Sequence, residues 1–292
     1  MRLLVTGGSG FLGGYVLREA ASRGHETVAL ARSAAAARAV AGRGAQPVTG
    51  DLDAAGELAG VFAAARCDAL VNLASLGFGH GPAIVAAARQ AGIRRAIFVS
   101  STAVTTTLAA PTKRVRLAAE QCIRDSGLDW TILRPTMIYG AQGDRNLSRL
   151  LAVLARTPML PVPGGGRHLQ QPVLVADVAD AVLAAAERPG TAGSCYDVAG
   201  PEPLTFAELL RISARAVASR TRFVPVPLTP LVAMARGYER LSHHPKIRAE
   251  QLRRLAEDKA FVIEDAERDL GYAPHPFPAG IRAEAEAMGL AR

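Results

Sequence analysis

The chain has 292 residues, 49% of them hydrophobic, which is enough for one large α/β domain or for a domain with a smaller companion. The formal net charge of +8 comes from 34 basic and 26 acidic residues that are dispersed along the sequence. Nucleic-acid binding needs basic residues clustered on one face, so we expect no nucleic-acid partner.

The N-terminal sequence MRLLVTGGSGFLG predicts a strand, a glycine turn and a helix. The apolar run Arg2 to Thr6 is typical of a buried strand, and a helical segment follows from Phe11 to Arg23. Gly7 lets the chain turn off the strand, Gly10 lets the backbone approach a pyrophosphate, and Gly13 lets the helix pack close to the sheet. The free N–H groups of the helix N-terminus suit phosphates. The pattern therefore indicates a dinucleotide site rather than an ordinary glycine turn.

The second predicted strand, Glu26 to Ala31, is followed by Arg32 and Ser33. A site that prefers NAD usually carries an acidic residue there, which binds the ribose 2′-hydroxyl. A carboxylate repels a 2′-phosphate, whereas a guanidinium and a hydroxyl bind one. This favours NADP over NAD as the cofactor. The alternative is that Arg32 is simply the first polar residue after a buried strand.

A brief third strand, Gln46 to Val48, leads into an acidic turn that contains Asp51 and Leu52. The acid is suited to bonding an adenine amino group. It is equally suited to cap the helix predicted from Ala54 to Arg66, and the two roles are compatible.

The fourth predicted strand, Ala69 to Leu73, continues into Ala74, Ser75 and a glycine-rich loop that contains His80. In a doubly wound sheet this loop leaves the carboxyl end of a strand beside the cofactor crevice. His80 is therefore a candidate proton donor or substrate contact, and the alternative is a solvated histidine.

Helices and strands then continue to alternate up to the sixth strand. The predicted segments are a helix from Pro82 to Ala91, a strand from Arg94 to Val99, a helix from Thr112 to Ser126 and a strand from Asp129 to Leu133. Alternation with short connections predicts an α/β fold, a Rossmann-type doubly wound parallel sheet with helices on both faces.

Beyond residue 140 the alternation is less regular. We predict a helix from Leu147 to Arg156, a loop from Pro158 to Gly166, a strand from Gln171 to Val175, a helix from Asp177 to Glu187, a strand from Ser194 to Val198, and a capping box of Thr205 and Glu208. We expect a dinucleotide-binding core over residues 1–140. Residues 141–292 should complete the sheet and form a smaller, mostly helical substrate lid.

The predicted lid from Phe223 to Tyr238 is apolar enough to favour an apolar or mixed substrate, although ordinary core packing explains the same residues. Arg145 and Arg236 keep a phosphate-bearing substrate open as an alternative. In either case we expect a small-molecule substrate.

Cysteine usage and hydropathy bear on the location of the protein. Cys67, Cys122 and Cys195 are far apart, and their spacing indicates neither a metal site nor a disulfide framework. No apolar run approaches the roughly 18 residues of a membrane span, and the N-terminus reads as a strand rather than a signal sequence. We expect a cytoplasmic protein without a bound metal or a membrane span.

Taken together, these motifs resemble the extended and atypical short-chain dehydrogenase/reductases, the NAD-dependent epimerase/dehydratase-like group. The resemblance covers nearly the whole chain. It rests on Thr6-Gly7-Gly8-Ser9-Gly10-Phe11-Leu12-Gly13, Gly50-Asp51-Leu52, Asn72-Leu73-Ala74, Arg134-Pro135-Thr136-Met137-Ile138-Tyr139-Gly140, Val175-Ala176-Asp177-Val178-Ala179 and Tyr196-Asp197-Val198-Ala199-Gly200-Pro201-Glu202.

The resemblance implies where the cofactor binds, and a homodimer would be normal for the family. The implied cofactor-binding residues are Gly7, Gly10, Phe11, Leu12, Gly13, Arg32, Ser33, Asp51, Leu52, Leu73, Ala74, Ser75, Arg116 and Pro135. The implied substrate contacts are His80, Ser101, Thr102 and Tyr139.

Active members of this family share a Ser/Thr and a Tyr-x-x-x-Lys pair, in which the tyrosine passes a proton and the lysine lowers its pKa. Ser101 falls at the serine position, but Thr112 stands where the tyrosine belongs and Arg116 where the lysine belongs. A threonine hydroxyl is too weak an acid to replace the phenol. Arg116 stays protonated and can bond a ribose but not transfer a proton. Lys113 is rotated by about 100° from Thr112 on a helix and is not a direct substitute.

Several residues are candidate replacements for the missing pair. Tyr139 closes the sixth-strand motif and can donate through its hydroxyl, and His80 and His168 are further candidates. Reduction of an activated enone or imine also needs only positioning, with water as the acid.

Two functions follow from this pattern. The first is an NADP-dependent oxidoreductase that reduces a small carbonyl, enone or imine, with Ser101 polarising the substrate and Thr112 or Tyr139 in an atypical catalytic set. The second is a non-catalytic NAD(P)-binding redox sensor or accessory protein. Ser101, the loop at His80 and the lid favour the enzyme.

Overall fold

The computed structural model describes all residues except 109, 141–142, 145, 243–248 and 292. The chain forms two compact units. Unit 1 comprises Met1–Thr136, Val175–Val198 and Val262–Ala273, and unit 2 comprises Met137–Leu174, Ala199–Phe261 and Pro274–Arg292. The boundary expected at residue 140 thus lies near the end of the first segment, but two later segments also belong to unit 1.

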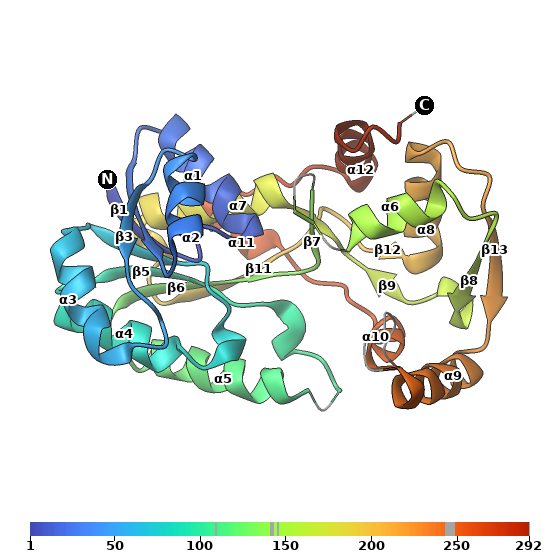
Figure 1. The fold of residues 1–292 in the computed structure, drawn as a ribbon, viewed down its shortest axis with the longest axis horizontal. Helices are drawn as coiled ribbons and strands as arrows, with labels where there is room; N and C mark the ends of the chain where they lie inside the picture. The colour runs from blue at the N-terminus through green and yellow to red at the C-terminus, as the bar shows by residue number, and fades with distance from the viewer. Residues whose placement is uncertain (109, 141–142, 145, 243–248, 292) are drawn as a thin grey trace. The chain divides into compact units, whose positions relative to one another are not determined.

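Unit 1 is built on a parallel sheet of seven strands (Figure 1). The strands are β1 (Arg2–Thr6), β2 (Glu26–Ala31), β3 (Gln46–Thr49), β4 (Ala69–Asn72), β5 (Arg95–Val99), β6 (Asp129–Pro135) and β11 (Ser194–Val198). Their order across the sheet is β11-β6-β5-β4-β1-β2-β3. The order reverses between β1 and β4, and doubly wound sheets bind their ligands beyond the carboxyl ends of the strands at such a reversal. The predicted Rossmann-type fold is confirmed.

Helices cover both faces of this sheet (Figure 1). They are α1 (Phe11–Ser22), α2 (Ala34–Ala41), α3 (Ala55–Ala65), α4 (Gly81–Gln90), α5 (Pro111–Arg124), α7 (Val175–Glu187) and α11 (Glu264–Leu270). Helices α3, α4 and α5 pack side by side on one face, and α1 packs against α7 on the other. Short one-turn helices η1 (Leu76–Phe78), η2 (Thr102–Val104) and η4 (Pro189–Thr191) lie in the connections.

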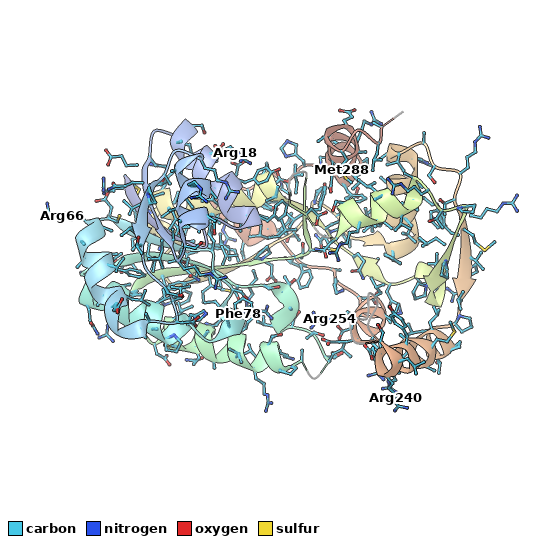
Figure 2. All side chains as sticks on the ribbon, in the orientation of Figure 1. Arg18, Arg66, Phe78, Arg240, Arg254 and Met288 are labelled. Carbon is cyan, nitrogen blue, oxygen red and sulfur yellow. The ribbon has the colours of Figure 1, made fainter. Side chains whose placement is uncertain are left out.

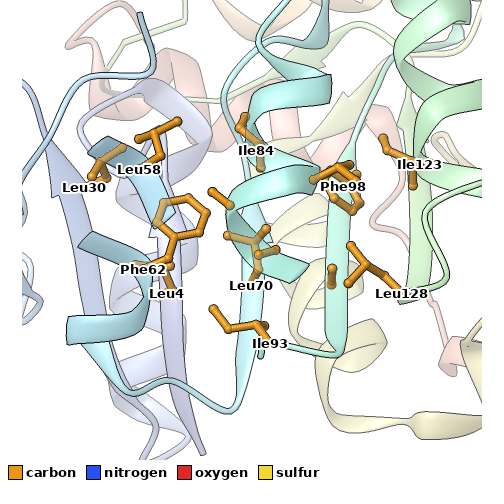
Figure 3. Packing of buried hydrophobic residues seen from close by; sticks show 14 of the residues in the cluster. Leu4, Leu30, Leu58, Phe62, Leu70, Ile84, Ile93, Phe98, Ile123 and Leu128 are labelled. Carbon is orange, nitrogen blue, oxygen red and sulfur yellow. The ribbon is translucent and has the colours of Figure 1, made fainter. Parts of the chain in front are cut away.

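The core under α3, α4 and α5 fixes the strand ends in place (Figure 3). Leu4, Leu70 and Phe98 from three neighbouring strands pack against Phe62 of α3 and Ile123 of α5, and all five side chains are fully buried. Burying a side chain of this size stabilises a fold by about 1.5–3 kcal/mol. The carboxyl edge of the sheet is therefore a rigid platform.

Unit 2 consists of short two-stranded pairs and helices. Its elements are β7 (Ile138–Tyr139), α6 (Leu147–Leu154), β8 (Met159–Pro163), η3 (Gly164–Gly166), β9 (Leu169–Gln170), β10 (Val173–Leu174), β12 (Leu204–Thr205), α8 (Phe206–Ala216), β13 (Arg222–Val226), α9 (Leu228–Leu241), α10 (Ala249–Arg254) and α12 (Phe277–Ala287). The predicted capping box is present, since Glu208 N–H donates to Thr205 Oγ1 at 3.2 Å and Thr205 N–H donates to Glu208 Oε2 at 2.8 Å.

Two sequence predictions in this region are wrong. Most of the segment predicted as a loop, Pro158–Gly166, forms β8, which pairs in parallel with β13. Its prolines are tolerated because, in a two-stranded pair, each strand has one edge that needs no hydrogen bond. The strand predicted from Gln171 to Val175 is confined to Val173–Leu174, and helix α7 already begins at Val175.

Unit 2 buries one carboxyl group against another. Glu284 of α12 is 2% exposed. Burial, followed by the nearby carboxyl of Asp144, raises the pKa of Glu284 to about 8. Glu284 is therefore protonated at neutral pH in the folded protein and ionised in the unfolded chain.

We expect this proton to make stability depend on pH. Between the unfolded pKa near 4.5 and the folded value near 8, only the folded state holds the proton, so the free energy of unfolding falls as pH rises. The slope is up to about 1.4 kcal/mol per pH unit. Glu284→Gln should flatten this profile in urea unfolding between pH 5 and 8. The same change at exposed Glu286 of α12 should leave it unaltered, and parallel profiles for Glu284→Gln and the wild type would contradict the assignment.

Candidate functional site

The carboxyl edge of the unit 1 sheet brings most of the predicted site residues together. Because the strands are parallel, the segments that follow β1 to β6 all emerge at this edge. Its residues include Gly7 after β1, Arg32 and Ser33 after β2, Asp51 and Leu52 after β3, Leu73, Ala74 and Ser75 after β4, Ser101 and Thr102 after β5, and Pro135 at the end of β6.

Gly7 makes a close backbone approach at this edge. Its φ of +73° is in the left-handed region that favours glycine. A Cβ at residue 7 would lie 2.7 Å from the backbone nitrogen of Ala74 and 2.8 Å from the carbonyl carbon of Leu73. Only a glycine allows the loop after β1 to rest on the loop after β4.

Gly10 and Gly13 shape the start of α1. Gly10 is the N-cap and provides no side-chain oxygen, so the N–H groups of Phe11, Leu12 and Gly13 have no partner within the helix. A Cβ on Gly13 would lie 2.4 Å from the carbonyl oxygen of Gly7. Gly13 therefore makes room for the glycine loop, whereas the sequence predicted that it makes room for the sheet. Three N–H donors and the positive end of the helix dipole suit a pyrophosphate.

The loop after β4 is held by buried hydrogen bonds. Leu73 N–H donates to the Thr6 carbonyl at 3.0 Å, and Asn72 Nδ2 donates to the Ala74 carbonyl at 3.1 Å. Thr6 Oγ1 donates to Asn72 Oδ1 at 2.6 Å. Ser75 Oγ accepts from Gly77 N–H at 3.3 Å and caps η1.

The side chains after β2 and β3 are partly used by the fold. Ser33 Oγ accepts from Ala36 N–H at 3.2 Å and caps α2, while Arg32 is exposed. Asp51 Oδ1 accepts from Asp53 N–H at 3.1 Å within the turn. The predicted capping of the next helix by this acid is wrong, because the N-cap of α3 is Ala54 and receives no side-chain hydrogen bond. The Ser33 hydroxyl hydrogen and the second Asp51 oxygen are left for other partners.

His80 is directed toward the acidic turn after β3. Its Nδ1 lies 3.7 Å from Asp53 Oδ1, and its ring packs edge-on against Phe78 with centroids 6.4 Å apart. His80 therefore lies beside the turn at which we placed the adenine. The substrate contact predicted for His80 stays a prediction.

Ser101 and Thr102 differ in what their hydroxyl groups do. Ser101 Oγ accepts from Ala103 N–H at 3.2 Å, so its own O–H is left to donate. Thr102 is buried, and its Oγ1 donates to the Pro135 carbonyl at 3.3 Å. The geometry favours Ser101 as a polarising group and gives Thr102 and Pro135 a structural bond between two loops.

A buried carboxylate anchors the residue next to Ser101. Glu120 of α5 is 0% exposed and accepts from Ser100 Oγ at 2.7 Å and from Arg134 Nε at 3.0 Å. Arg124 donates to the same carboxylate at 2.9 Å. Burial raises the pKa of Glu120, but the hydrogen bonds from Arg134, Ser100 and Arg124 outweigh it, so the pKa is lowered. The loop that carries Ser101 is therefore fixed to α5 and β6.

Helix α5 begins with the residues that we predicted at the positions of the family's tyrosine and lysine. Thr112 is exposed in the first turn. Lys113 Nζ donates to the Thr106 carbonyl at 2.5 Å. The Arg116 guanidinium lies against the loop after β4, because a Cβ on Gly77 would be 3.0 Å from its Cζ. A fixed cation thus faces the predicted cofactor loop, and Lys113 is held by the segment after η2.

Tyr139 belongs to unit 2 and is fully buried. Its ring packs edge-on against Phe277 at 5.3 Å, and Gly280 makes room for it, since a Cβ there would lie 2.2 Å from the phenol oxygen. A proton donor has to reach the substrate, so burial disfavours Tyr139 in that role. His168 is also in unit 2, where its Nδ1 lies 3.2 Å from Asp258 Oδ1.

Part of the predicted lid lines a surface pocket of about 280 Å³ in unit 2. Leu228, Val232 and Arg236 of α9 face Arg253 of α10 across it. The apolar walls and two guanidinium groups keep both predicted substrate types open. Arg145 lies outside the described residues.

Among the described residues, no group of three or more His, Cys, Asp or Glu side chains is arranged to hold a metal ion. In the same part of the chain, no helix combines the length and apolar character needed to cross a membrane. Cys67, Cys122 and Cys195 are free and partly buried.

The structure also reveals residues whose roles the sequence did not indicate. Arg134 stands in a motif that we recognised and Glu120 within the helix predicted from Thr112 to Ser126, but their pairing depends on α5 lying beside β6. Arg43 contacts the glycine loop from the turn after α2. A lone arginine between two glycines carries no local signal for such a contact.

Three features define a dinucleotide-binding protein of the Rossmann class. The strand order of the parallel sheet reverses between β1 and β4, a glycine loop follows β1, and free N–H groups lie at the start of α1. Comparison with known proteins agrees. Residues 7–189, more than half of the chain, match the NAD(P)H-binding family, and the chain belongs to that family.

Two relatives that align over more than 90% of their own length are reductases. A ketoreductase of Stigmatella aurantiaca, named for 4-hydroxy-2-methyl-3-oxo-4-farnesyl-3,4-dihydroquinoline-1-oxide, is 30% identical over 94% of this chain and 92% of its own length. The 2-alkyl-3-oxoalkanoate reductase of Stenotrophomonas maltophilia is 29% identical over 94% of this chain and 95% of its own length. These relatives support an NAD(P)-dependent oxidoreductase in general terms.

Solved structures have the same fold. The UDP-glucose 4-epimerase of Thermus thermophilus, determined in complex with NAD, superposes with a TM-score of 0.75 over 99% of each chain at 20% identity. The predicted likeness to the epimerase/dehydratase group is thereby confirmed for the fold.

Substituting Gly13 tests the geometry of the glycine loop. Gly13→Ala forces the Gly7 carbonyl to move, which should weaken the binding of NADPH about tenfold or more in a fluorescence titration. Gly60→Ala in α3 is the matched control, because nothing lies within 4 Å of a Cβ there. It should leave the Kd unchanged and raise stability by up to about 1 kcal/mol. Unchanged NADPH binding by Gly13→Ala would contradict the site.

Proposed function

We propose that the protein is an NADPH-dependent reductase of ketones. The observation that carries the proposal is Ser101, whose O–H is left to donate at the carboxyl end of β5, in a chain 30% identical to a ketoreductase. The glycine loop and the fixed edge of the sheet support the cofactor half of the proposal.

Preference for NADPH rests on the end of β2. The exposed Arg32 guanidinium and the Ser33 hydroxyl follow the strand, where a carboxylate would bind the ribose of NAD. Their positive charge and donors suit a 2′-phosphate.

The residues present support a simple reduction mechanism. NADPH, when bound, supplies a hydride to the carbonyl carbon of the substrate. Ser101 donates a hydrogen bond to the carbonyl oxygen and stabilises the negative charge that develops there. Arg116 stays protonated, so it adds a fixed positive charge but releases no proton. A water molecule therefore delivers the proton that completes the alcohol.

The substrate class follows from the names of the relatives. Both reductases that align over more than 90% of their length are named for ketones that carry hydrocarbon groups. We therefore propose amphiphilic ketones, such as 3-oxo acids with alkyl chains, over sugar nucleotides.

A binding protein without catalysis is the second candidate, favoured by one observation. Thr112 is exposed where the family's tyrosine stands, and Tyr139 is buried in unit 2. The test is whether the wild type oxidises NADPH when 3-oxo acids or cyclic ketones are added. Tight NADPH binding without turnover over this panel would favour the second candidate.

Removing the Ser101 hydroxyl should separate catalysis from binding. We expect Ser101→Ala to lower kcat by about 10²- to 10³-fold, as for other single donors to a developing oxyanion. The Kd for NADPH should not change. Loss of NADPH absorbance measures the rate, and Ser22→Ala at the exposed end of α1 is the control. Full activity of Ser101→Ala would contradict its role.

Reversing the charge after β2 should change cofactor preference. Arg32→Glu is expected to weaken NADPH binding about 10- to 100-fold while NADH binding is kept or improved. Arg38→Glu, an equal charge change on exposed α2, should weaken NADPH far less. Equal Kd values for NADPH in the wild type and Arg32→Glu would show that Arg32 does not contact the 2′-phosphate.

A further inference from the structure

Arg43 reaches the glycine loop from outside the recognised motif. It lies in the turn after α2, and its Nη1 donates to the carbonyl of Gly8 at 2.7 Å and to that of Gly10 at 3.3 Å. Both acceptors belong to the loop between β1 and α1. One guanidinium thus joins two peptide units of the loop.

Gly14 gives this side chain its room. A Cβ on Gly14 would lie 2.9 Å from Arg43 Cζ and 3.1 Å from Nε. Glycine inside a helix costs about 1 kcal/mol relative to alanine. The second glycine of the pair Gly13-Gly14 therefore accommodates Arg43, whereas the first accommodates the loop itself.

The two hydrogen bonds fix the directions of N–H groups. In a trans peptide, the C=O and the following N–H point to opposite sides of the chain. When the carbonyls of Gly8 and Gly10 point to Arg43, the N–H groups of Ser9 and Phe11 point away from it. The N–H of Phe11 is one of the free donors at the start of α1.

The charge of Arg43 lacks a carboxylate partner among the described residues. Burial, and then the positive charge of Arg18, lower the pKa of Arg43, although a guanidinium remains protonated. Arg18, which is labelled in Figure 2, lies over the Tyr15 ring, with its Cζ 4.7 Å from the ring centroid. Two neighbouring cations beside a loop of N–H donors favour a bound anion.

We propose that Arg43 is a positioning residue for the cofactor phosphates. It holds the peptide units after Gly8 and Gly10 so that their N–H groups face the pyrophosphate, and its charge strengthens the field there. This inference rests on the dinucleotide binding of the proposed function and is independent of the reaction.

Binding of cofactor fragments tests this role without turnover. Arg43→Met should weaken NADPH and ADP about 10- to 100-fold in calorimetry, because charge-assisted hydrogen bonds and loop order are lost. Adenosine, which has no phosphate, should bind equally to the wild type and the variant in an NMR titration. Arg43→Lys should recover part of the ADP affinity, and Arg38→Met on exposed α2 is the charge-matched control.

Gly14→Ala provides an independent variant that leaves Arg43 in the sequence. Its Cβ displaces the guanidinium and should reproduce the loss of ADP affinity. The double variant should be no weaker than Arg43→Met, because both changes remove one interaction. Unchanged ADP binding by Arg43→Met, or an equal loss for adenosine, would overturn the inference. Failure of the wild type to bind either ADP or NADPH would instead overturn the proposed function.

Discussion

The backbone of Gly7 lies so close to the peptide between Leu73 and Ala74 that no side chain fits between them. This contact joins the loops after β1 and β4, the two strands at which the order of the sheet reverses. Gly13 repeats the constraint in the first turn of α1, where its backbone lies against the Gly7 carbonyl. The position of the start of α1 and of its free N–H donors depends on these two approaches of backbone to backbone.

Elsewhere at this edge of the sheet, polar side chains are satisfied by hydrogen bonds that join neighbouring elements. Asn72 links β1 to the loop after β4, and Glu120 links the loop after β5 to α5 and β6. A buried carboxylate with three donors is costly to bury and still more costly to leave unpaired. This network holds Ser100, the residue before Ser101, and so restrains the loop after β5.

The sequence predicts the sheet well because its strands are short apolar runs between glycines, helices and turns. It also predicts the glycine loop and the capping box at Thr205, since each is a local pattern. It does not predict β8, whose prolines suggest a loop, because the pairing partner β13 lies far along the chain. For the same reason, the sequence does not predict the contact of Arg43 with Gly8 or that of Tyr139 with Phe277. Side-chain roles that depend on tertiary neighbours carry no local signal.

The path of the chain through unit 1 has a consequence for protein engineering. Strand β11 and helix α7 return to the sheet only after the chain has passed through part of unit 2, and α11 returns later still. A fragment that stops at residue 136 would expose the edge of β6 and leave the face beneath α7 uncovered. Open strand edges and bare apolar faces promote aggregation. A minimal cofactor-binding domain therefore has to be made by joining Thr136 to Val175 and Val198 to Val262, not by truncation.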